Sequence, residues 1–372
     1  MNRSVERTSF PIRGTTSGQV IVAPFVHPVR GPVHCPAAAL IAASLRDHGL
    51  DVRRSTRSLT VGPGPADGVL VNASYLDRGG QAVGFAVAVH LADEMAIAIA
   101  NEVVHGWSDM WRTRRVMVAG TGFTSDSCTC PGPLGGYRTQ EDEVSCAHAE
   151  IMSAEIDRFR CDGDHVVVIG KREDVAQPAN TSETTVVESA DEVAGIEADP
   201  ERIGYVVSPN VVVEDAALII AALRARFPRI RGQHPAGFCY GPSDRAASVR
   251  AVAAAAGSML VLGTAGSADT TEVTGLAASG GTPVQVIDHP ARISRASLRG
   301  VECIGIAVAR SSPPWLCQDV VEILSGLGPL SVVSRTVCSE TVGLDTRSAT
   351  NKGDRDPAVV PLPAGSPGRY CG

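Results

Sequence analysis

The sequence predicts an α/β protein in which parallel sheets are covered by helices. Short β-branched runs, bounded by glycine or polar residues, alternate with longer amphipathic segments along most of the chain. The runs expected to form buried strands lie at 19-25, 116-120, 165-170, 203-208, 259-263, 283-288 and 303-309. The segments expected to form helices lie at 36-49, 150-160, 213-228 and 243-257. In sheets of this class, ligands bind beyond the carboxyl ends of the strands.

The predicted helix ends carry the expected signals. Pro228 follows the third of these helices and Gly257 follows the fourth, and both residue types end helices. Ser243 and Asp244 begin the fourth helix and are expected to cap its N-terminus.

Composition excludes several classes of partner. The chain has 372 residues and a formal net charge of -7, and it shows no basic stripe that could neutralise the phosphates of a nucleic acid. It has no apolar run of about 18 residues, so we expect no membrane partner. The first residues lack the apolar core of a secretion signal, so we expect a cytoplasmic protein.

Ten cysteines raise the question of metal binding, because the cytosol keeps thiols reduced and disfavours a disulfide scaffold. The most informative one is Cys239, in a glycine- and proline-rich turn just before a predicted amphipathic helix. The positive end of a helix dipole favours the thiolate, which is the form that binds iron. The alternative interpretation is a buried structural cysteine.

Three segments surround Cys239 in a characteristic order. GYVVSPNVVVEDAALIIAALRARFPRI at 204-230 precedes it, and MLVLGTAGSADTTEVTGLA at 259-277 and CIGIAVARSSPPWLCQDVVEIL at 303-324 follow its helix. In this order the last two resemble the third lobe of the LytB family of iron-sulfur reductases, and the first resembles that family's segment before its third cysteine. The resemblance covers about 170 residues, from roughly 164 to 333.

The resemblance implies three α/β lobes with parallel sheets in a trefoil-like arrangement around a central 4Fe-4S cluster, each lobe giving one cysteine. Cys35 precedes a helix in the first lobe, and Cys239 does so in the third. For the second lobe, Cys146 directly precedes a helix, whereas Cys130 lies in a better-matching Thr-Cys-Pro string farther upstream; we prefer Cys146. We expect a flexible N-terminus at 1-18 and lobes at 19-115, 116-208 and 209-335. The segment at 349-372 is rich in proline, glycine and charge, which predicts a disordered tail.

The implied activity is the two-electron reductive removal of an allylic or related hydroxyl. In this family, three thiolates leave one iron of the cluster open to the substrate hydroxyl. The resemblance further implies a small-molecule substrate such as an isoprenoid diphosphate, with ferredoxin or flavodoxin as the electron donor.

The chain departs from the family pattern at the proton donor. The family's Gly-His-x-x-His-x-Glu segment is replaced by GKREDVAQ at 170-177, so the usual glutamate is missing. Glu173 or Asp174 is the candidate catalytic acid, because a carboxyl group in a desolvated site can acquire a raised pKa. The alternative is that both are solvated loop residues.

Four further residues are candidates for substrate binding by the resemblance. His105, in NEVVHG, corresponds to a phosphate ligand, or is a lone structural histidine. Ser311 keeps a family serine, while Ser267 and Asp269 stand in a Ser-Ala-Asp sequence where the family has Ser-Ser-Asn. The extra negative charge of Asp269 disfavours a diphosphate and favours a less anionic substrate.

Two alternatives of other classes remain. The side chains of Cys128, Cys130, Cys146 and His148 can make a tetrahedral zinc site, although their spacing is shorter than usual. A relative that has lost the cluster and binds a small ligand is the other, since fold alone does not confer function. The Gly-x-Gly after the strand at 116-120 lacks the rest of a dinucleotide-binding motif.

Overall fold

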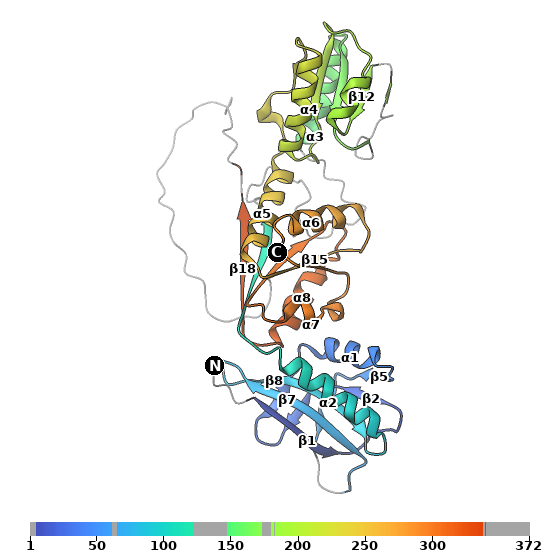
Figure 1. The fold of residues 1–372 in the computed structure, drawn as a ribbon, viewed down its shortest axis with the longest axis vertical. Helices are drawn as coiled ribbons and strands as arrows, with labels where there is room; N and C mark the ends of the chain where they lie inside the picture. The colour runs from blue at the N-terminus through green and yellow to red at the C-terminus, as the bar shows by residue number, and fades with distance from the viewer. Residues whose placement is uncertain are drawn as a thin grey trace, which may run out of the picture. The chain divides into compact units, whose positions relative to one another are not determined.

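The computed structural model describes residues 5–61, 65–121, 147–172, 180–181, 183–337 and 339 (Figure 1). The chain divides into two compact units. The first contains residues 1–120 and 248–335, and the second contains residues 121–247 and 336–372.

The N-terminal part of the first unit is a mixed sheet. It contains β1 (Glu6–Ile12), β2 (Val20–Val22), β3 (Phe25–His27), β4 (Gly31–His34), β5 (Val52–Arg54), β6 (Leu59–Thr60), β7 (Gly68–Leu76) and β8 (Ala82–His90). A short turn joins β7 to β8, so these long strands pair antiparallel rather than parallel. The segment at 1-18, which was expected to be flexible, contains β1. This strand pairs antiparallel with β7 from Glu6 to Ile12, and alternate side chains of β1 are partly buried.

Two helices cover this sheet. They are α1 (Ala38–Asp47) and α2 (Glu94–Ser108), and α2 packs on β7 and β8 (Figure 1). A separate apolar cluster of the sheet's own strands includes Phe25, Val33, Leu70 and Ala86, together with Cys35. The thiol of Cys35 therefore lies in a hydrocarbon environment.

Asp67 fastens the loop between β1 and β2. Its carboxylate accepts hydrogen bonds from Gly14 N at 2.9 Å, from Thr15 N at 3.0 Å and from Thr15 Oγ1 at 2.8 Å. The hydrogen bond from the Thr15 backbone, followed by those from Gly14 and the Thr15 hydroxyl, lowers the pKa of Asp67. The loop is thus held by an ionised carboxylate.

Asp67→Asn is expected to lower stability at neutral pH but to have little effect in acid. A carboxylate whose pKa is lowered by folding stabilises the protein above its unfolded pKa, about 3.9, and this stabilisation is lost as the pH falls through the folded value. Urea unfolding of both proteins at neutral pH and at a series of acid pH values that extends well below the unfolded pKa of about 3.9 measures the difference. A difference that stays constant with pH would contradict this role for Asp67.

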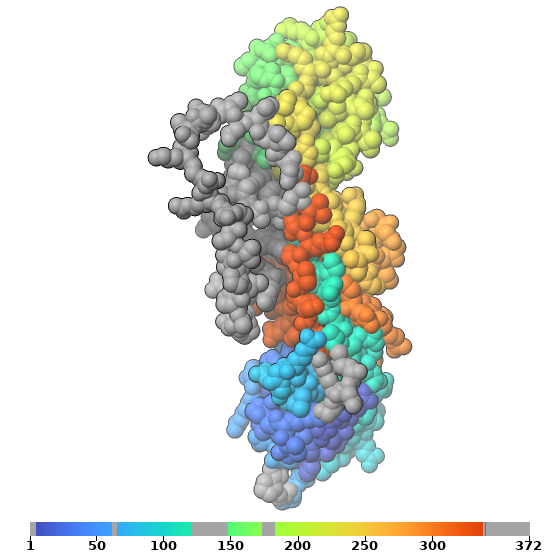
Figure 2. Space-filling view, turned by 90° about the vertical axis from the view of Figure 1, so that its left-hand side faces the viewer, coloured from blue at the N-terminus to red at the C-terminus, as the bar shows by residue number. Residues whose placement is uncertain are grey.

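The second sheet of the first unit is built on parallel pairs. Its strands are β9 (Arg114–Thr121), β15 (Ser258–Leu262), β16 (Val284–Ile287), β17 (Cys303–Val308) and β18 (Leu330–Val337), in the order β16-β15-β17-β9-β18. The pairs β16-β15, β15-β17 and β17-β9 are parallel. The strand expected at 116-120 therefore joins this sheet, while the lobe boundaries stay a prediction. β18 forms the sheet's edge and lies on the surface (Figure 2).

Helices pack on this sheet through alternate strand residues. They are α5 (Gly241–Ala255), α6 (Ala268–Ala278), α7 (Arg295–Leu298) and α8 (Pro314–Ser325). Val252 of α5 and Val273 of α6 share one apolar cluster with Met259, Val261 and Ala307 of the strands. This packing fixes the strand ends from which the loops to α6 and α8 leave.

The second unit has a smaller sheet. Its strands are β10 (His165–Ile169), β11 (Asn180–Thr181), β12 (Thr184–Val187), β13 (Ile203–Val207) and β14 (Arg231–Gly232), in the order β11-β12-β10-β13-β14. All its pairs are parallel except β11-β12.

Two helices cover opposite faces of the second unit's sheet. They are α3 (Ala147–Cys161) and α4 (Val213–Arg226). Phe159 of α3 packs with Val166 and Val168, whereas Leu223 of α4 packs in the cluster that contains Val167. This alternation is the pattern of a sheet buried on both sides.

The predicted α/β class with parallel sheets is confirmed. The helices and strands named from the sequence are present within a few residues of their expected bounds, except that the run at 19-25 forms two short strands, β2 and β3, instead of one. The predicted tail at 349-372 lies outside the described residues. Within the part of the chain that is described, no helix combines the length and apolar composition needed to cross a bilayer.

Candidate functional site

Three of the predicted substrate-binding residues meet at the carboxyl ends of β15 and β17. Ser267 and Asp269 follow β15, and Ser311 follows β17. The two strands are parallel neighbours, so the loops that leave them lie side by side. Together with Thr270, these side chains form what we call the hydroxyl cluster.

Hydrogen bonds join the two loops of the hydroxyl cluster. Asp269 Oδ2 accepts the Ser311 backbone N–H at 2.7 Å, and Asp269 Oδ1 accepts the Ser267 hydroxyl at 2.8 Å. The Ser311 hydroxyl lies 3.2 Å from both Ser267 Oγ and Thr270 Oγ1. Ser267 also caps α6, where its hydroxyl accepts a hydrogen bond from Thr270 N.

Asp269 is ionised in this arrangement. Partial burial by itself raises the pKa of Asp269, but hydrogen bonds from the Ser311 backbone and from the Ser267 and Ser311 side chains outweigh it, and the pKa is lowered. The loops at this sheet edge therefore carry a fixed negative charge at neutral pH.

Thr270 belongs to the cluster but was not predicted from the sequence. It is buried, and its hydroxyl lies 2.8 Å from Ser267 Oγ. Gly263 leaves room for it, because a Cβ on Gly263 would meet Thr270 Oγ1 and would lie 2.7 Å from Ala309 Cβ. A glycine at the end of a strand, followed by serine and threonine, was the available signal.

Cys239 lies in a buried turn that Gln233 holds in place. The Gln233 side chain accepts a hydrogen bond from Val207 N at 2.9 Å and donates one to Gly237 O at 3.0 Å. Gln233 is 3% exposed and Cys239 is 4% exposed. The turn is thus tied to the carboxyl end of β13, directly before α5.

The residues after Cys239 have roles other than those predicted. Ser243 accepts a hydrogen bond from Val213 N and donates one to Glu214, both on α4. Asp244 accepts hydrogen bonds from the backbone and hydroxyl of Ser339. Both residues lie within the first turns of α5, which begins at Gly241 and not at Ser243. Their side chains bond to the start of α4 and to Ser339.

Cys35 has very different surroundings. It is buried in the apolar cluster of the first sheet, and burial raises the pKa of its thiol to about 12. Its sulfur is 3.7 Å from Val33 O and 4.0 Å from Ala23 O. In the absence of a bound cation, these surroundings favour the thiol over the thiolate that a metal requires.

The remaining predicted residues are not brought together by the described part of the chain. His105 lies on the exposed side of α2, where its imidazole has no described hydrogen bond to the hydroxyl cluster. Among the described residues, no group of three or more His, Cys, Asp or Glu could hold a metal ion. The other predicted residues lie outside the described ranges, namely Cys130, Cys146, Glu173 and Asp174, with Cys128 of the zinc alternative.

His148, the fourth ligand of the zinc alternative, is described and lies on α3. It is partly buried, and desolvation lowers the pKa of its imidazole. A neutral imidazole is the form that binds zinc, but the three cysteines that would share the site are not described.

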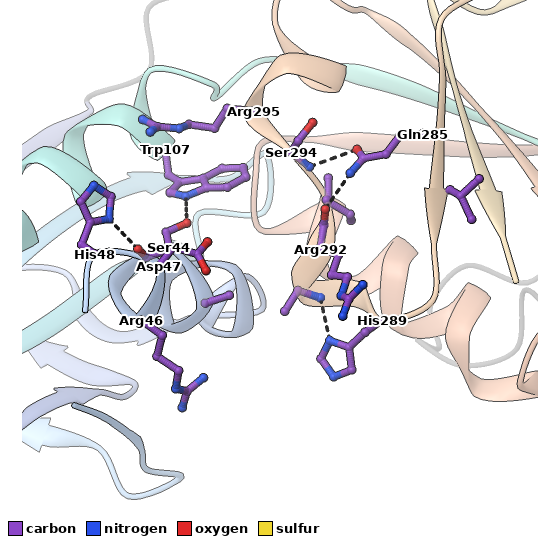
Figure 3. A pocket seen from close by; sticks show the side chains of 14 residues that line it. Ser44, Arg46, Asp47, His48, Trp107, Gln285, His289, Arg292, Ser294 and Arg295 are labelled. Carbon is purple, nitrogen blue, oxygen red and sulfur yellow. Dashed lines mark hydrogen bonds between the residues drawn. The ribbon is translucent and has the colours of Figure 1, made fainter. Parts of the chain in front are cut away.

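The first unit also contains a cavity of about 650 Å³ between the end of α1, Trp107 of α2 and the segment at 285–295 (Figure 3). Its walls are fixed by internal hydrogen bonds. Trp107 Nε1 donates to Ser44 Oγ at 2.8 Å, and Gln285 bonds the backbones of Arg292 and Ser294. None of the predicted site residues lines it.

Fold and site together define an α/β protein with a cluster of polar side chains at the carboxyl ends of two parallel strands. A family model described as "LytB protein" matches residues 139–325, just over half of the chain. The chain belongs to the LytB family.

Relatives named as reductases are about 31% identical to this chain over the part that aligns. The 4-hydroxy-3-methylbut-2-enyl diphosphate reductase 2 of Mycobacterium bovis is 31% identical over 206 residues, which cover 54% of this chain and 62% of the relative. The 4-hydroxy-3-methylbut-2-enyl diphosphate reductase of Marinobacter nauticus is 31% identical over 207 residues, covering 52% and 63%. The chain thus spans less than two thirds of the length of these relatives.

A similar solved structure is that of the E-1-hydroxy-2-methyl-but-2-enyl-4-diphosphate reductase from Plasmodium falciparum. It has a TM-score of 0.45 and 18% sequence identity, and the match covers 54% of this chain and 65% of that chain.

Proposed function

We propose that this protein is an iron-sulfur oxidoreductase that removes an allylic or related hydroxyl by two-electron reductive dehydroxylation. The substrate differs from the family's isoprenoid diphosphate or is bound in an altered way. Membership of the LytB family supports the reaction class, since the matched residues include Cys239 and both loops of the hydroxyl cluster.

The observation that carries the proposal is the position of Cys239. Gln233 ties its turn to β13, and α5 begins two residues later, so the sulfur is fixed near a helix N-terminus. A thiolate near a helix N-terminus is the form of cysteine that binds iron. We propose that Cys239 is one of three thiolate ligands of a 4Fe-4S cluster and that Cys146 and Cys35 are the other two, with Cys130 as the alternative to Cys146.

The surroundings of Cys35 give that member of the set no support. An apolar cluster surrounds its sulfur, and its thiol pKa is high in the absence of a cation. Individual serine replacements of Cys35, Cys130 and Cys146 therefore decide which thiols hold the cluster. Metal analysis of the same proteins separates iron from the zinc alternative.

The bound cluster would supply the two electrons one at a time, received from a ferredoxin or flavodoxin. Replacing a C–OH bond by a C–H bond consumes two electrons and two protons and releases water, so the chain's own residues must orient the substrate and help to deliver protons. We propose that the hydroxyl cluster orients the end of the substrate, with His105 as a further candidate contact, and that Glu173 or Asp174 donates the proton that leaves with the hydroxyl as water.

Replacing the proton donor is expected to reduce turnover strongly. If Glu173 is the acid, Glu173→Gln lowers kcat by at least about 100-fold with little change in KM, whereas Asp174→Asn is nearly silent; the effects reverse if Asp174 is the acid. Anaerobic turnover of allylic alcohols and their diphosphates with reduced viologen measures both variants. Full activity in the double variant would show that neither carboxyl group is the donor.

The same assay tests the function itself. Formation of the dehydroxylated product, with oxidation of two viologens per product, supports the proposed reaction. If iron-replete protein converts none of the allylic or aromatic alcohols or their diphosphates, the proposed reaction is wrong.

A further inference from the structure

We propose that Asp269 makes the hydroxyl cluster select a substrate that presents a hydroxyl or another uncharged hydrogen-bond donor, and exclude a diphosphate. This inference rests on the proposed function, because it names the substrate class of the same site. It assigns Asp269 a role in specificity and not in the chemical step.

The donor groups of the cluster are already engaged with one another. The Ser311 backbone N–H and the Ser267 hydroxyl lie at 2.7 and 2.8 Å from the two oxygens of Asp269. The hydroxyls of Thr270 and Ser311 are 3.2 Å apart and both lie near Ser267 Oγ. Each hydroxyl carries a single hydrogen, so hydrogens that a phosphate would need are already used inside the cluster.

Acceptor capacity, in contrast, is in excess. An ionised carboxylate only accepts hydrogen bonds, and it offers about four lone-pair positions. The hydroxyl oxygens add further acceptors. Ser311 is exposed and Asp269 is partly exposed, so an incoming group can reach them. The group that fits best is therefore one that donates, such as an alcohol, and a diphosphate would meet both an acceptor surface and a like charge.

Asp269 also occupies the place that an anion would take at α6. It lies in the first turn of this helix, where the positive end of the dipole attracts negative charge. The ordinary role of a carboxylate at this position is to stabilise its own helix. Asp269 does more, because it accepts a hydrogen bond from Ser311, which lies 42 residues away on the other loop. Asp269 therefore links the two loops and itself occupies the position at the start of α6 that an external anion would take.

Inorganic pyrophosphate is the probe for this inference. Calorimetric titrations without divalent cations compare the full-length protein with Asp269→Asn, which keeps the size of the side chain and can still accept from Ser311 N. We expect the variant to bind pyrophosphate at least about tenfold more tightly than the wild type. Asp215→Asn is the matched control, because it removes the same charge from the exposed first turn of α4 and should leave binding unchanged.

Three results would overturn the inference. One is equal affinity of the wild type and Asp269→Asn for pyrophosphate, whether both bind or neither does. Another is an equal gain in Asp215→Asn, which would point to net charge alone. The third comes from a repeat of the wild-type titration with Mg²⁺ added. Tight binding of pyrophosphate in that titration alone would show that Asp269 recruits the anion through a cation. Asp269→Ser removes the same negative charge with a different side chain and should show the same gain in affinity. Thermal melts of every variant show that the differences do not come from misfolding.

A second comparison distinguishes this inference from the proposed function. With reduced, iron-loaded protein, we expect the wild type to convert 2-methylbut-2-ene-1,4-diol in preference to 4-hydroxy-3-methylbut-2-enyl diphosphate, and Asp269→Asn to shift kcat/KM toward the diphosphate. A higher kcat/KM of the wild type for the diphosphate than for the diol would support the reductase function and refute the role of Asp269 in specificity. Absence of turnover with both substrates would refute the proposed reductase function. The pyrophosphate titration would still test whether Asp269 excludes a diphosphate.

Discussion

Cys239→Ser is expected to abolish cluster binding and reductase turnover together. Serine keeps the shape of the turn, but its hydroxyl does not ionise near neutral pH and is a poor ligand for iron. Loss of one thiolate from a set of three should weaken cluster binding by more than the roughly 10- to 100-fold typical for loss of a supporting contact. Iron analysis and EPR spectra of the dithionite-reduced variant measure the effect.

Cys161→Ser is the matched control, because Cys161 is exposed at the end of α3 and has no proposed part in the cluster. It should keep the iron content, spectrum and turnover of the wild type. A Cys239→Ser protein with full iron content and a wild-type spectrum would show that Cys239 is a structural cysteine.

Gly305→Ala is expected to destabilise the protein by about 3 kcal/mol, at the upper end of the usual cost of overpacking a core. Gly305 lies in β17, where a Cβ would meet Met259 Sδ and would lie 2.8 Å from Val252 Cγ1 and 3.2 Å from Ala256 Cβ. The absence of a side chain allows α5 to pack closely on the sheet. Urea denaturation gives the free energy of unfolding.

Gly275→Ala tests whether this effect is specific to position 305. Gly275 lies inside α6, where an added Cβ would meet no neighbouring atom within 4 Å, so alanine there should stabilise the helix by about 0.5–1 kcal/mol. Opposite signs for the two variants are therefore expected. A Gly305→Ala protein as stable as the wild type would refute the close packing of α5 on β17.

The parallel strands were predictable because their sequences carry a strong local signal. Runs such as 166-169 and 303-309 are apolar, contain β-branched residues and are bounded by glycine or polar residues, as expected of strands buried on both faces. The β7–β8 hairpin was not predicted. Both strands are buried on both faces and therefore do not alternate between apolar and polar residues. The polar residues Asn72 and Ser74 also interrupt the apolar run of β7, although both are buried.

Part of the candidate site could also be predicted. Ser267, Asp269 and Ser311 were named as substrate-binding candidates by their resemblance to family motifs, and the parallel pairing of β15 and β17 brings them to one edge of the sheet. Thr270 and Gln233 were missed because their importance comes from burial and from bonds to distant segments. No local pattern distinguishes them from ordinary loop residues.

The two cysteines show the limit of local sequence. Cys35 and Cys239 both stand before a helix, yet one lies in an apolar cluster and the other in a turn held by Gln233. Cys35 acquires its hydrocarbon neighbours from strands up to about 50 residues away in the chain, such as Ala82 and Ala86. The sequence around each cysteine does not contain that information.

The most direct test of the central claim is the amount of iron and acid-labile sulfide bound per chain after anaerobic purification. The proposed function predicts about four of each, with the absorption and EPR spectra of a 4Fe-4S cluster that disappear in Cys239→Ser. Protein that remains free of iron after anaerobic reconstitution, or that binds zinc instead, would contradict it.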